Sequence, residues 1–149
     1  IGLYDGHRSL TFRIANRRGN RIIDANIRLT YARNRVSEDG SFRRDMIDLP
    51  LRRSIAPVLS YTWSVYHDID QESPFSDANR HSIPNEDGAL MVSVTGRDED
   101  LANTIHSQYT YGEDSLVWGA RFVDILSTDE KGRTKVHYDR FHKFEHGEI

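Results

Sequence analysis

The sequence contains no cysteine, and this absence excludes two kinds of structure at once. Disulfide bridges cannot form and thiolate metal sites cannot assemble, a composition that suits a reducing compartment such as the cytoplasm. Long apolar runs are also missing, because each run stops far short of the roughly 20 residues that a membrane-spanning helix requires. We therefore expect these residues to form a soluble unit.

A large surplus of charge of one sign is lacking as well. The 20 basic and 23 acidic side chains give a formal net charge of −3, so we expect no nucleic-acid partner. The chain begins at Ile1 rather than at methionine, so we expect it to be part of a longer protein whose membrane segments lie outside these residues. Its 149 residues, of which 37% are hydrophobic, fit a single compact domain over residues 1–149.

The sequence signatures of common enzymes do not occur. GxSxG, GxxxxGK[ST], GxGxxG and HExxH are all absent. His67 with its neighbours Asp68 and Asp70 comes nearest to an acid–base group. We favour a structural role for His67, because it follows an apolar strand and the acids precede a turn. We expect no catalytic residue and no cofactor, while an enzyme that uses His67 remains an open alternative.

Two clusters of metal-ligating residue types need separate consideration. His142 and His146 are four residues apart, a spacing at which two histidines on a helix face one metal, but no third ligand accompanies them. Asp98-Glu99-Asp100 is an acidic run that could bind a cation, although such a run between strands is usually a solvated loop. We predict no metal site.

The sequence does contain repeated alternation of apolar and polar residues. From Ile23 to Tyr31 the odd positions are apolar and the even positions polar, which is the period of a half-buried strand. Further strands are predicted at Leu10–Ala15, Met46–Leu51, Leu59–Val65, Leu90–Thr95 and Thr134–Asp139.

Turn-forming residues separate these strands, at Glu38-Asp39-Gly40, at Pro84-Asn85-Glu86-Asp87-Gly88 and at Lys131-Gly132. Seven or more short strands divided in this way predict an all-β fold, an immunoglobulin-like antiparallel β-sandwich. One or two short helical segments are expected beside it. One is at Ser73-Pro74-Phe75, with serine as N-cap and proline at the first helical position.

Several segments, taken in order, resemble the cytoplasmic domain of bacterial-type inward-rectifier potassium channels. The aromatic-rich segments Leu116–Phe122 (LVWGARF) and Lys135–Lys143 (KVHYDRFHK), which flank the turn Ser127–Gly132, are similar to the family's closing strands. His67–Phe75 resembles the family segment H-x-I-[DN]-x-x-SP-[LF], and the resemblance runs in order from residue 9 to residue 144. The short connection Leu51–Pro57 is similar to that of bacterial members.

The resemblance implies that four copies of the chain form a homotetramer on the cytoplasmic face of the membrane. This tetramer would extend a potassium pore and gate it. We also expect the channel to belong to the voltage-gated class. By the same resemblance the pore-lining residues are Asp24, Asn26, Arg28 and Thr95, and the constriction called the G-loop comprises Gly96, Ala102, Asn103 and Thr104. Candidate contacts for anionic lipid headgroups are Arg17, Arg18 and Arg21.

Each of these site assignments has a plainer alternative. The polar positions of the strand can be the solvent-exposed face of any sandwich strand. Residues 102–104 can be an ordinary loop that leads into a strand, and the arginine cluster can be a solvated turn. A soluble immunoglobulin-like interaction module without a pore also stays open. A fourfold assembly would distinguish the channel domain from such a module.

Overall fold

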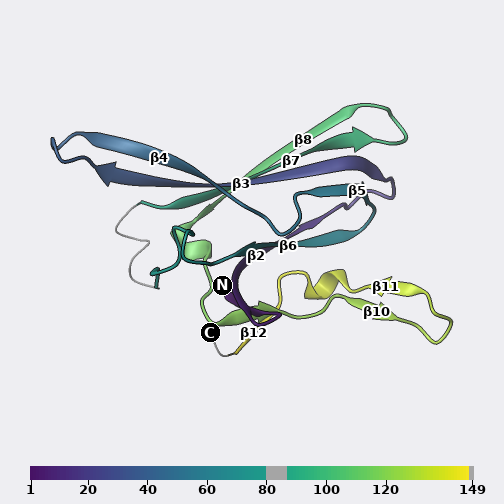
Figure 1. The fold of residues 1–149 in the computed structure, drawn as a ribbon. Helices are drawn as coiled ribbons and strands as arrows, with labels where there is room; N and C mark the ends of the chain where they lie inside the picture. The colour runs from purple at the N-terminus through teal and green to yellow at the C-terminus, as the bar shows by residue number, and fades with distance from the viewer. Residues whose placement is uncertain (80–86, 148–149) are drawn as a thin grey trace.

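The computed structural model describes residues 1–79 and 87–147, and almost all of its regular structure is antiparallel β-sheet (Figure 1). A five-stranded sheet has the order β4-β3-β7-β8, with β5 also paired to β3, and a three-stranded sheet has the order β1-β2-β6. The predicted all-β class and its antiparallel sandwich are therefore confirmed. The strands of these two sheets are β1 (Gly2–Tyr4), β2 (His7–Ala15), β3 (Ile22–Val36), β4 (Phe42–Leu49), β5 (Ile55–Leu59), β6 (Thr62–Asp68), β7 (Ala89–Asp98) and β8 (Thr104–Gly112).

Two small two-stranded sheets follow in the C-terminal part of the chain. Strand β9 (Ala120–Phe122) pairs with β12 (Phe144–His146), and β10 (Leu126–Thr128) pairs with β11 (Thr134–Val136). Figure 1 shows the β10–β11 hairpin extending beneath the sandwich, on the same side of the view as the β7–β8 turn. Among the described residues, short helical segments occur as the 3-10 helices η2 (Glu113–Ser115) and η3 (Tyr138–Arg140), neither of which is at the predicted Ser73-Pro74-Phe75.

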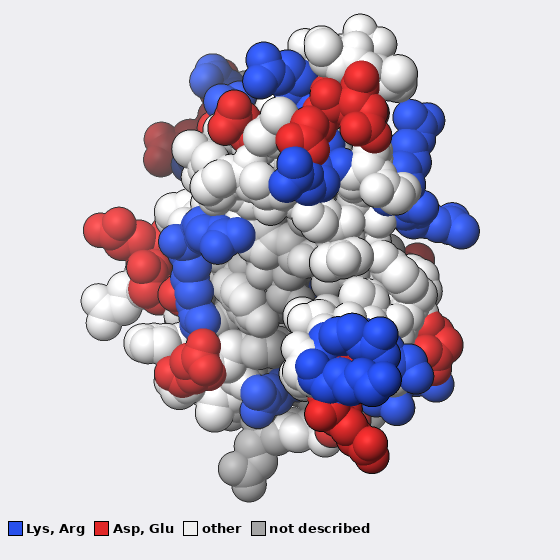
Figure 2. All heavy atoms as spheres, turned by 90° about the vertical axis from the view of Figure 1, so that its right-hand side faces the viewer, with Lys and Arg blue, Asp and Glu red and all other residues white. Residues whose placement is uncertain are grey.

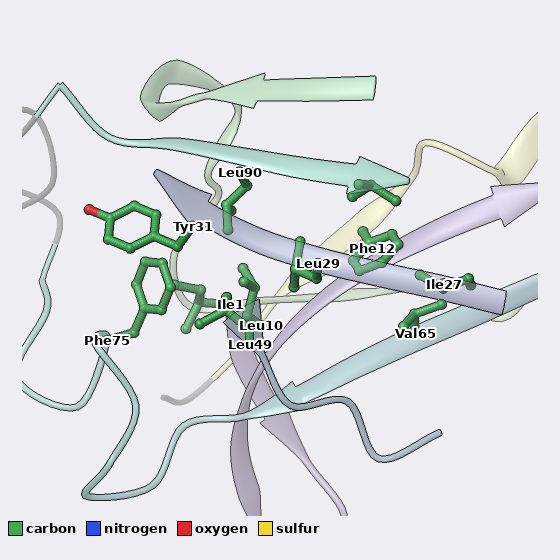
Figure 3. Packing of buried hydrophobic residues seen from close by; sticks show 11 residues of the cluster. Ile1, Leu10, Phe12, Ile27, Leu29, Tyr31, Leu49, Val65, Phe75 and Leu90 are labelled. Carbon is green, nitrogen blue, oxygen red and sulfur yellow. The ribbon is translucent and has the colours of Figure 1, made fainter. Parts of the chain in front are cut away.

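The hydrophobic core lies between the two large sheets. Tyr31 of β3 packs its ring 4.7 Å from the ring of Phe75, whose side chain is completely buried (Figure 3). Burial of one such large apolar side chain contributes about 1.5–3 kcal/mol. Both sheets supply the remaining members, which include Leu10, Phe12, Ile27, Leu29, Leu49, Val65, Leu90 and Val92.

The alternation in β3 sets which residues reach this core. Ala25, Ile27, Leu29 and Tyr31 are buried, while the polar residues between them lie on the opposite face of the sheet. The strand is longer than its periodic segment, because it continues past Tyr31 into a hairpin with β4. One face of the sheet is thus fixed against the core and the other is left to water.

The segment Leu59–Val65 was predicted as one strand, and this prediction is wrong. Strand β5 ends at Leu59, the chain turns, and β6 begins at Thr62 in the other sheet. Tyr61, which the alternation places on the buried face, is 56% exposed, and its carbonyl accepts the backbone N–H of Asn16. The two-residue turn preserves the alternation in the sequence, so periodicity alone does not reveal it.

The two aromatic-rich segments near the C-terminus are not one hairpin. In Leu116–Phe122 only the last three residues form a strand, and that strand pairs with Phe144–His146. The polar turn between the segments belongs instead to the β10–β11 hairpin. The alternation predicted for Thr134–Asp139 stops at Val136, after which the backbone forms a 3-10 helix.

The turn predictions have mixed outcomes. At Glu38–Gly40 and at Lys131–Gly132 the chain reverses as expected, and both glycines adopt the positive φ that such turns favour. Ser73-Pro74-Phe75 is a turn and not a helix, with Ser73 Oγ accepting the Phe75 backbone N–H at 3.2 Å. The remaining predicted turn lies largely outside the described residues, because 84–86 are not among them.

Arg52, in the connection between β4 and β5, binds side chains of the three-stranded sheet. Its Nε donates to both carboxylate oxygens of Asp68 at 2.8 and 2.9 Å, and its Nη1 lies 3.0 Å from Asp5. Its guanidinium also lies 5.0 Å from the centre of the Tyr66 ring. Hydrogen bonding from Arg52 holds the pKa of Asp68 below its ordinary value of 3.8.

Arg52→Gln should therefore weaken the domain at neutral pH more than in acid. A carboxyl whose pKa is lower in the folded state stabilises that state above its unfolded pKa, and this contribution disappears as pH falls through the folded pKa. With solvent screening we expect a loss of about 1 kcal/mol at pH 7 that shrinks steadily below pH ~4. Urea unfolding at several pH values measures it, and a difference between the two proteins that is independent of pH would contradict it.

Candidate functional site

The outward face of β3 carries the predicted pore-lining residues. Asp24 and Asn26 are exposed on it, and Asn26 is paired in register with Thr95 of β7, which is paired in turn with His106 of β8. The structure therefore brings Asn26 and Thr95 together, in a polar row that crosses three strands. His106 belongs to the same row, and sequence reasoning did not select it.

Asp24 is held in an irregular backbone conformation. The pairing of β3 with β7 shifts register between Ile23 and Asn26, and Asp24 has a φ of 50°. Such a bulge places two residues of one strand opposite one of the other, and a positive φ is tolerated best by glycine, asparagine and aspartate. The bulge keeps the Asp24 carboxylate on the outward face while Ala25 stays buried.

Gly96 lies opposite this bulge, inside β7 and not in the turn that follows it. A Cβ at this position would lie 2.6 Å from Cγ2 of Ile22 and 3.3 Å from the carbonyl oxygen of Ile23. The absence of a side chain at Gly96 thus permits the close approach of β7 to β3.

Arg28 is farther along the same face and has a partner of its own. It is four positions on from Asp24, about 13 Å along the strand. Its Nε lies 3.9 Å from a carboxylate oxygen of Asp48 in β4, with side-chain exposures of 71% and 65%. So exposed a pair contributes little to stability, but it places an opposite charge beside Arg28.

The β7–β8 turn carries the remaining constriction candidates. Ala102, Asn103 and Thr104 are all exposed there, and Ala102 has a φ of 52°. The turn is organised by Asp98, only 3% exposed, whose carboxylate accepts the backbone N–H groups of Asp100 and Leu101 at 3.0 and 3.1 Å. The acidic run is thus not wholly a solvated loop, because its first residue is buried and hydrogen-bonded.

The three candidate lipid-binding arginines lie in the loop between β2 and β3. Arg17 and Arg18 are exposed, whereas Arg21 donates from Nε and Nη2 to the two carboxylate oxygens of Glu99, each at 2.5 Å. These hydrogen bonds raise the pKa of Arg21. Figure 2, which faces this end of the molecule, shows basic and acidic side chains intermixed rather than one continuous basic patch.

A second contact joins the β2–β3 loop to the β7–β8 turn. Asn20 Nδ2 donates to Asp98 Oδ2 at 2.5 Å, and the backbone N–H of Glu99 donates to the carbonyl of Arg21 at 3.0 Å. The candidate lipid-binding loop and the candidate constriction turn are therefore neighbours joined by both side chains and backbone.

His67 has the structural position that we favoured. It is 1% exposed, with Nδ1 2.8 Å from the carbonyl oxygen of Pro50 and Nε2 2.8 Å from Ser73 Oγ. His142 and His146 are not on one helix, since His146 lies in β12. In the described part of the chain, three or more metal-ligating side chains nowhere gather in one group.

Comparison with known proteins shows the family to which this chain is related. A family model described as "Inward rectifier potassium channel C-terminal domain" matches residues 1–148. The chain is 34% identical over 143 residues to the inward rectifier potassium channel Kirbac3.1 of Paramagnetospirillum magnetotacticum, covering 96% of this chain and 48% of that protein. It is 32% identical over 146 residues to human G protein-activated inward rectifier potassium channel 1, covering 95% and 29%.

The fold and site define a β-sandwich domain that exposes one polar sheet face and, at one end, two joined loops. The chain belongs to the family of inward rectifier potassium channel C-terminal domains. The resemblance read from its sequence is thereby confirmed, and the match to Kirbac3.1 supports the bacterial type. The relatives are named as channels and not enzymes, but their names give no support to voltage gating.

The chain spans about half or less of the length of these curated relatives. Among its described residues, no helix has the length and apolar character required to cross a membrane.

Proposed function

We propose that the chain is the cytoplasmic domain of a homotetrameric inward rectifier potassium channel, in which four copies extend the ion path and help to gate it. The observation that carries the proposal is the family match over residues 1–148. The polar row on the outward face of β3 and β7 supports it, because a sheet that lines a water-filled path needs one core face and one polar face.

The primary test is potassium flux from liposomes that contain the longer protein of which this chain is a part. We expect flux through the intact protein and altered gating when residues 1–149 are deleted. The mass of the isolated chain, measured by light scattering over a concentration series, tests assembly separately. A tetramer would support the pore-lining residues, and unaltered flux and gating in the deleted protein would contradict the proposal.

Polyamine block should be weak in the proposed channel, because Asp24 supplies an acidic ring on the ion path and Thr95 does not supply a second. One Asp24 carboxylate about 8 Å from a potassium ion in water contributes about 0.5 kcal/mol, and four contribute about 2 kcal/mol before screening by salt. The resemblance to the family implies that animal members with strong rectification have a second acid where this chain has Thr95. Thr95 lies beside Asn26 on the same face and supplies no charge.

Thr95→Glu should therefore increase the potency of spermine block by about tenfold or more, since it adds four carboxylates beside the Asp24 ring. Ser127→Glu, in the exposed hairpin strand β10, is the matched control and should leave block unchanged. Patch-clamp titration with spermine measures both. Potent block of the unmodified channel that survives Asp24→Ala would contradict the assignment of Asp24 to the ion path.

The proposed partners also include anionic lipid headgroups, bound by Arg17, Arg18 and Arg21. Each arginine near an anionic surface contributes about 1 kcal/mol. Arg21 is already held by Glu99, so it should contribute less than the two unrestrained arginines.

Vesicle flotation should then show an uneven loss of binding. Changing all three arginines to alanine should abolish most binding to anionic vesicles, Arg17→Ala should reduce it severalfold, and Arg21→Ala should reduce it less. Arg133→Ala, in the β10–β11 hairpin, is the control. Equal binding by the triple variant and the unmodified chain would reject the lipid contact.

A further inference from the structure

A cavity of about 370 Å³ lies on the inward side of β3, opposite the polar row, and it is enclosed by β2, by β7 and β8, and by C-terminal residues between Ser115 and His142. Its wall is mainly apolar and includes Leu10, Leu29, Leu90, Val92, Leu116 and Phe122. A second hollow of about 190 Å³ is also lined by Leu10, Leu116 and Phe122. The larger volume falls within the range of small-ligand sites and corresponds to about a dozen non-hydrogen atoms.

Arg13 of β2 lines this cavity and brings a charge to it. Its Nη2 donates to the carbonyl of Val123, its Nε lies 3.3 Å from Ser64 Oγ, and its guanidinium is 4.5 Å from the centre of the Phe122 ring. Within the described part of the chain it has no carboxylate as an ion-pair partner. Burial is the main cause that lowers the pKa of Arg13, and the weaker opposing effects of Tyr4, Tyr66 and the Asp124 carboxylate do not cancel it.

Two neighbouring polar atoms beside the cavity lack hydrogen-bond partners. They are Nη1 of Arg13 and Oγ1 of Thr11, both buried and both unpartnered among the described residues. The residues are two apart on β2, so their side chains project to the same side of the strand, about 7 Å apart at the backbone. This side is opposite to that of Leu10 and Phe12, and the cavity is lined from both sides of β2. Buried groups of this kind normally have a partner, and an acceptor with two oxygens could satisfy both.

We propose that the cavity binds a small amphipathic anion, namely an aliphatic carboxylate of about ten carbons whose head contacts Arg13 and Thr11. The chain of the ligand lies against the apolar wall, where it displaces water from Leu29 and Val92. Because neither polar atom is exposed to water in this structure, binding requires the Arg13 side chain to turn toward the cavity. The proposal does not depend on the pore-lining role of the opposite sheet face.

Isothermal titration calorimetry of the folded chain with decanoate, 1-decanol and decyltrimethylammonium tests both parts of the site. We expect one decanoate per chain, bound at least tenfold more tightly than the alcohol or the cation. Arg13→Met should weaken decanoate binding about tenfold or more and leave the alcohol unchanged, since a hydrogen-bonded charge is lost. Leu116→Trp, which fills the cavity, should weaken both decanoate and decanol.

Arg53→Met is the matched control. Arg53 is an exposed arginine 4.8 Å from the ring centre of Trp63 and lines neither hollow, so its replacement should leave decanoate affinity unchanged. Circular dichroism and urea midpoints establish that each variant is folded. If Arg13→Met does not fold, Thr11→Val removes one donor at nearly constant shape and should weaken decanoate severalfold. Equal affinities for decanoate and decanol, absence of saturable decanoate binding, or full affinity in the Arg13 or Thr11 variant would overturn the proposal.

Discussion

Replacing Gly96 with valine should lower the free energy of unfolding by more than about 3 kcal/mol, and Gly96→Ala should lower it by about 1–3 kcal/mol. The new Cβ would lie 2.6 Å from Cγ2 of Ile22, a β-branched side chain that has little freedom to move, and 3.4 Å from the Cα of Ala25. The bulge that holds Asp24 would have to separate from β7 to make room.

Urea unfolding followed by circular dichroism measures these losses. Gly112→Ala is the matched control, because Gly112 lies in β8 of the same sheet and has no atom within 4 Å of an added Cβ. We expect the control to change stability by less than about 0.5 kcal/mol. A Gly96→Val protein as stable as the control would show that the approach of β3 to β7 is not as close as described.

Ala102→Trp should reduce potassium current through the assembled channel by more than tenfold. The proposed constriction places this exposed turn near the fourfold axis, where four indole groups would fill the ion path. Ala102 has a φ of 52°, and its own Cβ already bears the strain of about 1–2 kcal/mol that this conformation costs, so the loss of current is expected from the bulk of the indole. Asn103→Trp, at a neighbouring position without a positive φ, should give the same loss of current.

Currents must be compared between tetramers of equal abundance at the membrane. Ser41→Trp, in the exposed turn between β3 and β4, adds the same bulk at a distant site and should leave the current unchanged. Full current through both the Ala102 and Asn103 variants would move the constriction away from this turn without affecting the assignment to the family.

The alternation of residues predicted the strands whose two faces meet different surroundings. Strand β3 is the clearest example, because between Asp24 and Tyr31 its odd positions are buried in the core and its even positions lie on the opposite face. The same signal failed at Ser60–Tyr61, where the chain leaves one sheet for the other while the alternation continues. The periodicity of apolar residues indicates which side chains of a strand face the core. It does not indicate the sheet to which that strand belongs.

The site could be predicted only as separate pieces. The exposed polar positions of β3 follow from alternation, and the arginine cluster is visible in the sequence. The pairing of Arg21 with Glu99 joins residues 78 positions apart and therefore leaves no local signal. The burial of Asp98 was missed for a related reason, since an acidic run normally indicates solvent, and only its contact with Asn20 and the turn amides explains its position.

The pairing of β3 also has a consequence for how the protein is made. One edge of β3 pairs with β4 and β5, which follow soon after it in the chain. The other edge of β3 pairs with β7, which comes later in the chain. When residues up to the end of β6 have emerged from the ribosome, β3 is therefore a long strand with one unpaired edge. Open edges of this kind invite pairing with other chains, so the interval before Asp98 emerges is when a nascent chain depends most on chaperones.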